Sequence, residues 1–332
     1  MTSTSSPSIP PSPLRPLCPL WQKNNPSWHT ALLCLIAALA CWAVLPLLLE
    51  YLTDDLDPWT VNGMRYVFSA GFWLPLVLRD ARRLPPTGPS SRHALLLASL
   101  PVAAALVGSQ LCYGATPYFT DATHMNFGCR LSIPFATLFG FWLLPTERPL
   151  AKTPLFWLGL LASAAGFLLL FGRSWTPGTA TTPALLLMLG YSLFWGLYVV
   201  LVRRRLSPWP AHLSYGIVSL AVCAVMLVLM FLLGNPSTLL HLPLRLWFVL
   251  FFGAMLGLAW SHVLYYRALR VTGPIAGESG MLLLPFLTAH LAHLFLNETL
   301  LPGQWLSGLL LLLGCLLLLL SRYLLHRRHS AA

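Results

Sequence analysis

Long apolar segments follow one another along almost the whole chain, and this feature restricts the fold more than any other. Between residues 30 and 324 they are long enough to cross the hydrocarbon core of a bilayer. Only 9% of the 332 residues are charged, whereas soluble domains carry about 25%. Lipid offers the backbone no hydrogen-bond partners, and continuous rather than alternating runs favour helices over a closed barrel. The sequence therefore predicts an all-α integral membrane protein.

Ten transmembrane helices are predicted, with glycine and proline at most of the joints between them. The predicted ranges are 30–50, 60–79, 93–113, 117–144, 154–172, 183–202, 212–233, 246–266, 273–296 and 304–324. With both termini placed in the cytoplasm, 16 of the 20 lysines and arginines fall on the cytoplasmic side, and only Arg173 and Arg245 fall on the other. This asymmetry predicts a multi-pass protein with cytoplasmic N- and C-termini.

The two halves of the chain repeat one pattern. Pro134 is followed thirteen residues later by Glu147, and Pro285 is followed thirteen residues later by Glu298. Five spans per repeat is an odd number, so the second copy enters the membrane from the opposite side. Such repeats build a central site that opens to each side in turn. The pattern therefore predicts two inverted five-helix repeats and favours a transporter.

The first helices of the two repeats correspond more loosely. Trp42 aligns with Trp195, and each helix is followed by a Pro-Trp turn, at 57–59 and at 207–209. The predicted organisation is a flexible cytoplasmic tail rich in Ser and Pro (1–28), a first repeat (29–173), a second repeat (180–324) and a basic cytoplasmic tail (325–332).

Several of these motifs occur together in one known family. The proline-to-glutamate blocks end in PTERPL and LNETL, and Arg65 in LDPWTVNGMRYVFSAGFWLPL (56–76) matches an arginine early in the family's second span. Over residues 30–322 the chain resembles the EamA-type carriers of the drug/metabolite transporter superfamily. Thr146 and Asn297 depart from it, because the family often has glycine before each loop glutamate.

The resemblance implies a plasma-membrane (inner-membrane) carrier with a central cavity, in which the fifth and tenth helices give outer support. Substrates of the family range from amino acids and other metabolites to drugs, so the resemblance implies a small-molecule substrate without naming it. Both a monomer and a homodimer are compatible with the sequence.

One charged residue lies near the middle of the fourth predicted span, where Arg130 occurs in THMNFGCRLSIPF (123–135). An arginine there stays protonated and is expected to face the interior of the bundle. It can anchor a carboxylate or phosphate of the substrate, or form an ion pair with Glu278 in the ninth span. Glu278 can in turn exchange a proton during transport or serve as a static partner. The sequence leaves these alternatives open.

Further candidate residues surround this position. Asn126 precedes Arg130 by four residues and shares its helix face. The predicted substrate-binding set is Arg130, Glu278, Asn126, Arg65, His124, Trp42 and Trp195. Glu147 and Glu298, at the ends of spans, are interpreted as structural loop residues.

Other function classes lack the residues they need. The sequence contains no nucleophile triad, phosphate loop or nucleotide-binding block, so neither an enzyme, a cofactor nor ATP-driven transport is predicted. The net charge of +11 comes from short loops rather than one basic face, which argues against nucleic-acid binding. His290 and His293 are spaced for one metal ion but have no clear third ligand, so no metal site is expected.

The hypothesis from sequence is a secondary transporter in the lipid bilayer that moves a small organic metabolite with an anionic or zwitterionic group by alternating access. Proton-coupled export is one version of this hypothesis. The alternative is a non-transporting polytopic membrane protein, either an intramembrane enzyme that uses histidines and acids or a structural partner.

Overall fold

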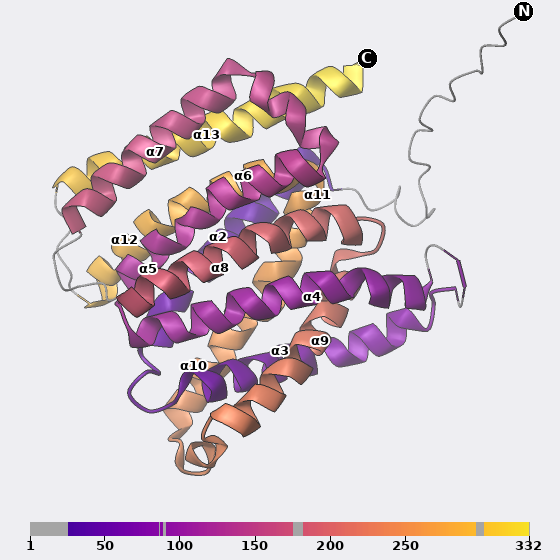
Figure 1. The fold of residues 1–332 in the computed structure, drawn as a ribbon, viewed down its shortest axis with the longest axis vertical. Coiled ribbons are helices and arrows are strands. Elements are labelled where there is room, and N and C mark those ends of the chain that lie inside the picture. Colours follow the sequence, from indigo (N-terminus) through magenta and orange to yellow (C-terminus); the bar gives the residue numbers. More distant parts are fainter. Residues whose placement is uncertain (1–25, 86, 89–90, 175–181, 297–301, 332) are drawn as a thin grey trace, which may run out of the picture.

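The computed structural model describes residues 26–85, 87–88, 91–174, 182–296 and 302–331, and within them every regular element is a helix (Figure 1). The longer helices are α2 (Trp28–Glu50), α3 (Pro58–Ala81), α4 (Arg92–Ala115), α5 (Ala122–Gly128), α6 (Ser132–Leu143), α7 (Pro154–Ser174), α8 (Thr182–Leu201), α9 (Ala211–Leu233), α10 (Leu244–Ala254), α11 (Ser261–Gly280), α12 (Leu284–Leu296) and α13 (Pro302–Ala331). Short segments join or interrupt them: η1 (Thr116–Tyr118), η2 (Cys129–Leu131), η3 (Pro145–Lys152), η4 (Val202–Leu206), η5 (Pro236–His241), η6 (Met255–Trp260) and η7 (Met281–Leu283). The predicted all-helical class is confirmed for this part of the chain.

Helices occupy all ten predicted ranges. By length and composition, five helical stretches in the described residues are candidate membrane spans: Trp28–Glu50, Arg92–Tyr118, Thr182–Leu206, Ala211–Leu233 and Leu244–Thr288. The number of crossings and the inverted relation of the two repeats stay predictions. The predicted N-terminal tail lies almost wholly outside the described residues, whereas the predicted C-terminal tail continues α13 as far as Ala331.

The fourth predicted span is not one helix. The sequence predicts a continuous helix over 117–144, but α5 ends at Gly128, the 3-10 helix η2 follows, and α6 begins at Ser132. Pro134 explains the break, because proline has no N–H for the carbonyl of Arg130 and its ring collides with that carbonyl. Arg130 therefore lies in a tight turn within the span rather than on a regular helix.

A similar break occurs between α11 and α12. Here Pro285 removes the helical hydrogen bond to the carbonyl of Met281, and the 3-10 helix η7 occupies the gap. A second interruption lies earlier in α11, where Gly273 has φ 76° and ψ 166°. Glycine adopts this left-handed region at little cost. Gly273 thus marks the predicted joint at the start of the range 273–296.

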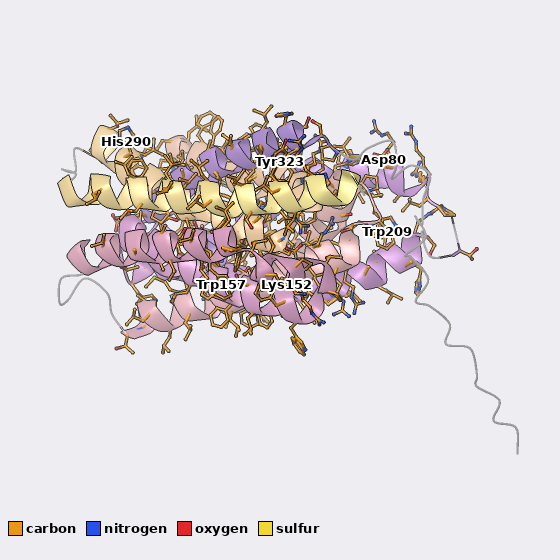
Figure 2. The ribbon with its side chains drawn as sticks, turned by 90° about the horizontal axis from the view of Figure 1, so that it is seen from above. Asp80, Lys152, Trp157, Trp209, His290 and Tyr323 are labelled. Carbon is orange, nitrogen blue, oxygen red and sulfur yellow. The ribbon has the colours of Figure 1, made fainter. Side chains whose placement is uncertain are left out.

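Four pairs of helices form the frame of the bundle: α3 with α9, α4 with α8, α2 with α11, and α7 with α13. The last pair lies along one edge of the molecule (Figure 1). A Cβ on Gly159 of α7 would lie only 3.0 Å from the carbonyl oxygen of Gly314 in α13, so glycine is needed for this close approach. In Figure 2, His290 lies at one end of the bundle, and Asp80 and Trp209 lie at the other.

Two aspartates tie α3 to α9. Asp57 caps α3 by accepting hydrogen bonds from the backbone N–H groups of Trp59 (3.0 Å) and Thr60 (2.9 Å). It also accepts from the Thr60 hydroxyl at 2.6 Å and from the backbone N–H of Asn235, just beyond α9, at 2.9 Å. Burial alone would raise the pKa of the Asp57 carboxyl, but these hydrogen bonds outweigh it and hold the pKa below its usual range.

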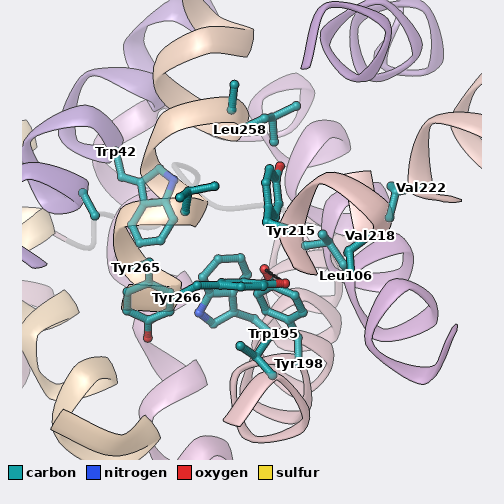
Figure 3. Packing of buried hydrophobic residues seen from close by; sticks show 14 of the residues in the cluster. Trp42, Leu106, Trp195, Tyr198, Tyr215, Val218, Val222, Leu258, Tyr265 and Tyr266 are labelled. Carbon is teal, nitrogen blue, oxygen red and sulfur yellow. Dashed lines mark hydrogen bonds between the residues drawn. The ribbon is translucent and has the colours of Figure 1, made fainter. Parts of the chain in front are cut away.

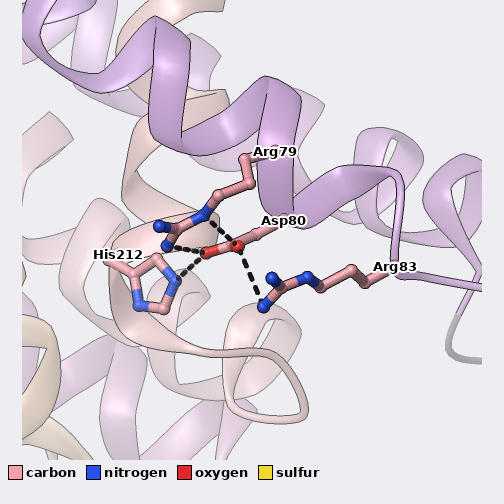
Figure 4. Close-up of polar contacts among 4 residues, drawn as sticks. All are labelled: Arg79, Asp80, Arg83 and His212. Atoms are coloured by element: carbon pink, nitrogen blue, oxygen red, sulfur yellow. Dashed lines mark hydrogen bonds and ion pairs between the residues drawn. The ribbon is translucent and has the colours of Figure 1, made fainter.

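The opposite ends of the same helices meet at Asp80 (Figure 4). Its carboxylate contacts Arg79 Nε at 2.9 Å, Arg83 Nη1 at 3.7 Å and His212 Nε2, at the start of α9, at 3.0 Å. The hydrogen bond from Arg79 is the main reason why the pKa of Asp80 lies below its usual range. Because Arg79 and Arg83 are largely exposed, these ion pairs contribute little stability one by one.

We expect Asp57→Ala to lower the free energy of unfolding by about 1–2 kcal/mol, because α3 loses its cap and its link to α9. Thermal unfolding of the purified protein in detergent measures this, with the exposed Asp54→Ala as control. Since the folded-state pKa of Asp57 is lowered, its contribution is present above the usual value of 3.8 and is lost as the pH falls through the lower folded value. Equal melting temperatures for the two variants would contradict this role.

Candidate functional site

A narrow cavity lies between elements from both halves of the chain. Its lining consists of Trp42, Leu45, Gln110, Tyr113, Asn126, Arg130, Tyr191, Trp195, Gly257, His262, Met281 and Leu284. The space open to the centre of a water molecule is about 20 Å³. This volume holds about one water molecule. The described conformation is therefore too narrow for a metabolite, which can enter only if the walls move apart.

Arg130 forms part of the cavity wall and is 4% exposed. Its Nε donates to the backbone oxygen of Asn126 at 2.9 Å, and its Nη2 contacts Asn126 Oδ1 at 3.3 Å. Its Nη1 donates across the bundle to the carbonyl oxygen of Met281 at 3.3 Å, the carbonyl that Pro285 deprives of its helical partner. All of these acceptors are neutral, so they orient the guanidinium without neutralising its charge.

Asn126 connects Arg130 to two further helices. Its Nδ2 donates to the hydroxyl of Thr288 in α12 at 2.5 Å, and that hydroxyl donates to the carbonyl of Ala43 in α2 at 2.8 Å. The predicted pairing of Asn126 with Arg130 on one face is therefore present, although the two residues lie on either side of a helix break.

Glu278 is fully buried and is surrounded by hydrogen-bond donors. Its carboxylate accepts from Ser132 Oγ at 3.0 Å, from Trp195 Nε1 at 2.9 Å and from the Tyr265 hydroxyl. No ion pair joins Glu278 to Arg130, both of which the structure describes. The direct ion pair considered from the sequence is therefore absent. Glu278 lies behind Trp195 and is not among the residues that line the cavity.

Trp42 and Trp195 form an aromatic wall of the cavity (Figure 3). Their rings meet edge to face with centroids 5.6 Å apart. Trp42 Nε1 donates to the carbonyl of Gly257 at 3.0 Å, and Trp195 Nε1 donates to Glu278. Since both indole N–H groups are bound, both rings are fixed in orientation. The residues aligned between the two repeats thus meet at the cavity.

Arg65 is fully buried in α3 but does not itself line the cavity. Its Nη1 donates to Asn62 Oδ1 at 3.4 Å, and Asn62 Nδ2 donates to the carbonyl of Gln110, a lining residue, at 3.0 Å. Arg65 thus lies directly behind the wall. The side chain of His124, the remaining predicted site residue, lies outside the described residues.

Several lining residues were missed by sequence reasoning. Gln110 and His262 are polar residues within apolar spans, and a search for such residues would have identified them. Tyr113 and Tyr191 had no such signal, because aromatic residues occur in nearly every span. No group of three potential metal ligands occurs among the described residues, and the side chain of His293 lies outside them.

A separate polar site links Glu147 to the C-terminal helix. The Glu147 carboxyl is fully buried in η3, and its Oε1 lies 3.3 Å from Arg322 Nη2 in α13. A side chain on Gly273 would collide with this carboxyl. Burial raises the pKa of Glu147, and the nearby Arg322 and Arg203 only partly oppose the rise. Glu298, its counterpart in the repeat, lies outside the described residues.

Comparison with known proteins identifies the family of the second half of the chain. Residues 182–320 match the EamA-like transporter family, so the family expected from the sequence is confirmed there. One crystal structure, described only as that of a protein, aligns with a TM-score of 0.68 and 18% identity over 91% of this chain and 99% of that chain. At this identity the likeness shows the fold alone. No curated protein matches the chain. The family match and the apolar helices together indicate a multi-pass membrane protein.

We expect Arg322→Gln to lower the free energy of unfolding by about 3 kcal/mol, because it removes the ion-pair partner of the buried Glu147. Adding Glu147→Gln should recover most of the loss. Thermal unfolding in detergent tests both, with the exposed Lys152→Gln as control. If the single and double variants have the same melting temperature, well below that of the wild type, loss of the ion pair does not explain the lower stability.

The same carboxyl predicts a dependence on pH. Because the folded state raises the pKa of Glu147, its favourable contribution is complete below the usual value of 4.5 and is lost as the pH rises through the folded value. Glu147→Gln should flatten this slope in melting temperature against pH. An unchanged slope would show that another group produces it.

Proposed function

We propose that this protein is a secondary transporter that moves a small organic metabolite with an anionic or zwitterionic group across the plasma membrane by alternating access. The match to the EamA-like transporter family supports the transporter class. The substrate class comes from the chemistry of the cavity wall.

The observation that carries this proposal is the charge of Arg130. Its guanidinium is nearly completely buried, faces the cavity and contacts only neutral acceptors. No carboxylate within the described part of the chain forms an ion pair with it, although Glu278 lies within electrostatic range. A buried charge without an ion-pair partner is costly, and an anionic group of the substrate can become that partner in a bidentate geometry suited to guanidinium.

The packing of the helices supports two inverted repeats of five spans. A twofold relation pairs α3 with α9 and α7 with α13, and both pairs are in contact. Under the same twofold relation, the contact between α4 and α8 is equivalent to the contact between α11 and α2, and both contacts are present. Counted back from Pro134 and Pro285, the breaks at η2 and η7 differ in position by one residue. This arrangement and the distribution of basic residues support the proposal of ten crossings with both termini cytoplasmic.

Proton coupling is assigned to Glu278. Its carboxyl is fully buried, accepts hydrogen bonds from hydroxyl and indole groups, and forms no ion pair with Arg130, which lies within electrostatic range. It also holds Trp195, which lines the cavity. A change in the protonation of Glu278 would alter its bond to Trp195, so that proton exchange and substrate binding are linked. The second class of function, a non-transporting membrane protein, predicts no such linkage.

Reconstituted protein in liposomes should show substrate-dependent flux for at least one compound in a broad panel of small metabolites. Arg130→Gln should reduce that flux at least about tenfold, since a charged hydrogen bond contributes roughly 1.5–3 kcal/mol. Arg245→Gln, an exposed arginine at the start of α10, should transport normally. Absence of flux for every compound would refute the transporter, and unchanged flux in Arg130→Gln would refute the anchor.

Glu278→Gln should abolish accumulation driven by a pH gradient and retain exchange of substrate without a gradient, because the amide cannot carry the proton. Flux with and without the gradient separates the two effects. Asp80→Asn, at the end of α3, is the matched control. A Glu278→Gln variant that still responds to the gradient would exclude Glu278 as the proton carrier.

A further inference from the structure

Arg65 has free hydrogen-bond donors although it is completely buried. Only Nη1 has a partner, Asn62 Oδ1 at 3.4 Å, whereas Nε and Nη2 have none in the described structure. Arg130 differs, because Nε, Nη1 and Nη2 each meet an acceptor. Buried polar groups are nearly always satisfied, so two free guanidinium nitrogens at one residue require an explanation.

The environment of Arg65 provides no counter-charge. None of the acidic groups that the structure describes forms an ion pair with it, and its electrostatic neighbours are the neutral phenols Tyr66, Tyr113 and Tyr215. Arginine does not lose its proton in proteins, so the charge persists.

This charge lies next to the same cavity that Arg130 lines. A Cβ on the lining residue Gly257 would lie 3.2 Å from Arg65 Nη2, so that nitrogen lies beside a residue of the cavity wall. Gln110 Oε1 and His262 Nε2 also lack partners, and both residues line the cavity. The amide of Gln110 can turn its NH₂ toward an anion.

Both guanidinium groups lie within electrostatic range of Tyr113, on the cavity wall. The wall beside it is formed by Trp42 and Trp195. One compact organic molecule that passes along this aromatic wall can therefore meet both charges.

We propose that Arg65, with Gln110 beside it, forms a second anion-binding subsite of this cavity, and that the transported substrate is a compact organic dianion, such as a dicarboxylate. The inference rests on the proposed transport function and specifies its substrate class. Arg130 binds one negative group and Arg65 binds the other.

Matched pairs of acids that differ by one carboxylate test the proposal. Isothermal titration of the full-length protein in detergent compares succinate with butyrate and terephthalate with 4-methylbenzoate. At least one diacid should bind about tenfold more tightly than its monoacid partner, which corresponds to roughly 1.4 kcal/mol. In Arg65→Gln the ratio of diacid affinity to monoacid affinity should fall to about one. If Arg65→Gln does not fold, Gln110→Leu replaces it and should lower the same ratio. Arg245→Gln should keep the wild-type ratio.

The outcomes separate the two proposals. A diacid with no advantage in the wild type, or an advantage that persists in Arg65→Gln, overturns the second subsite. Even if the second subsite fails in this way, monoacids that bind the wild type but not Arg130→Gln would support Arg130 as the anion anchor. If no acid binds, or if Arg130→Gln changes nothing, the anchor fails as well.

A free inorganic anion is the remaining occupant to distinguish. The titrations are repeated with chloride in place of gluconate as the buffer anion. Chloride that raises the affinity of a monoacid to that of its diacid would assign the subsite to an inorganic ion and overturn the dianion. Equal affinities in the two buffers support the organic dianion.

Discussion

A helix that breaks in an apolar environment leaves backbone groups without hydrogen-bond partners, which lipid cannot provide. In this protein one such group, a carbonyl beside the cavity, finds its partner in a side chain from the other half of the chain. Pro285 leaves the carbonyl of Met281 without its helical donor, and the guanidinium of Arg130 donates to it from the other half of the chain. The same guanidinium is oriented by Asn126, which is held in turn by Thr288. The two broken spans are thus joined by a cation that also faces the cavity.

The two halves differ where they meet. Counted back from the prolines, Arg130 in the first half corresponds to Met281 in the second, so the pattern places a cation opposite an apolar side chain. Glu278 does not restore the balance, because it is engaged by Ser132, Trp195 and Tyr265 behind the wall. A scaffold of two similar halves therefore contains an interior that is chemically one-sided. Such an interior favours one orientation of a charged molecule over the other.

The helical ranges followed from the sequence because apolar periodicity and Gly or Pro at the joints are local properties of the chain. Trp42, Trp195, Asn126 and Arg130 were also found, the tryptophans through the repeat and the polar residues through their place in apolar spans. The break at η2 was missed, although Pro134 is its cause, because the apolar run continues through it. Contacts between distant spans were less accessible. The sequence suggested Arg130 as a partner of Glu278, but tertiary packing places Trp195 and Tyr265 at the carboxylate.

The water-sized cavity has a consequence for affinity. Because the walls leave about 20 Å³, the described conformation cannot hold a metabolite, and the proposed substrate would need a more open form. The measured affinity of any ligand is then the intrinsic affinity reduced by the fraction of molecules that are open at a given moment. A substitution far from the cavity that loosens the packing of the walls would therefore tighten binding, without touching a single group that contacts the ligand.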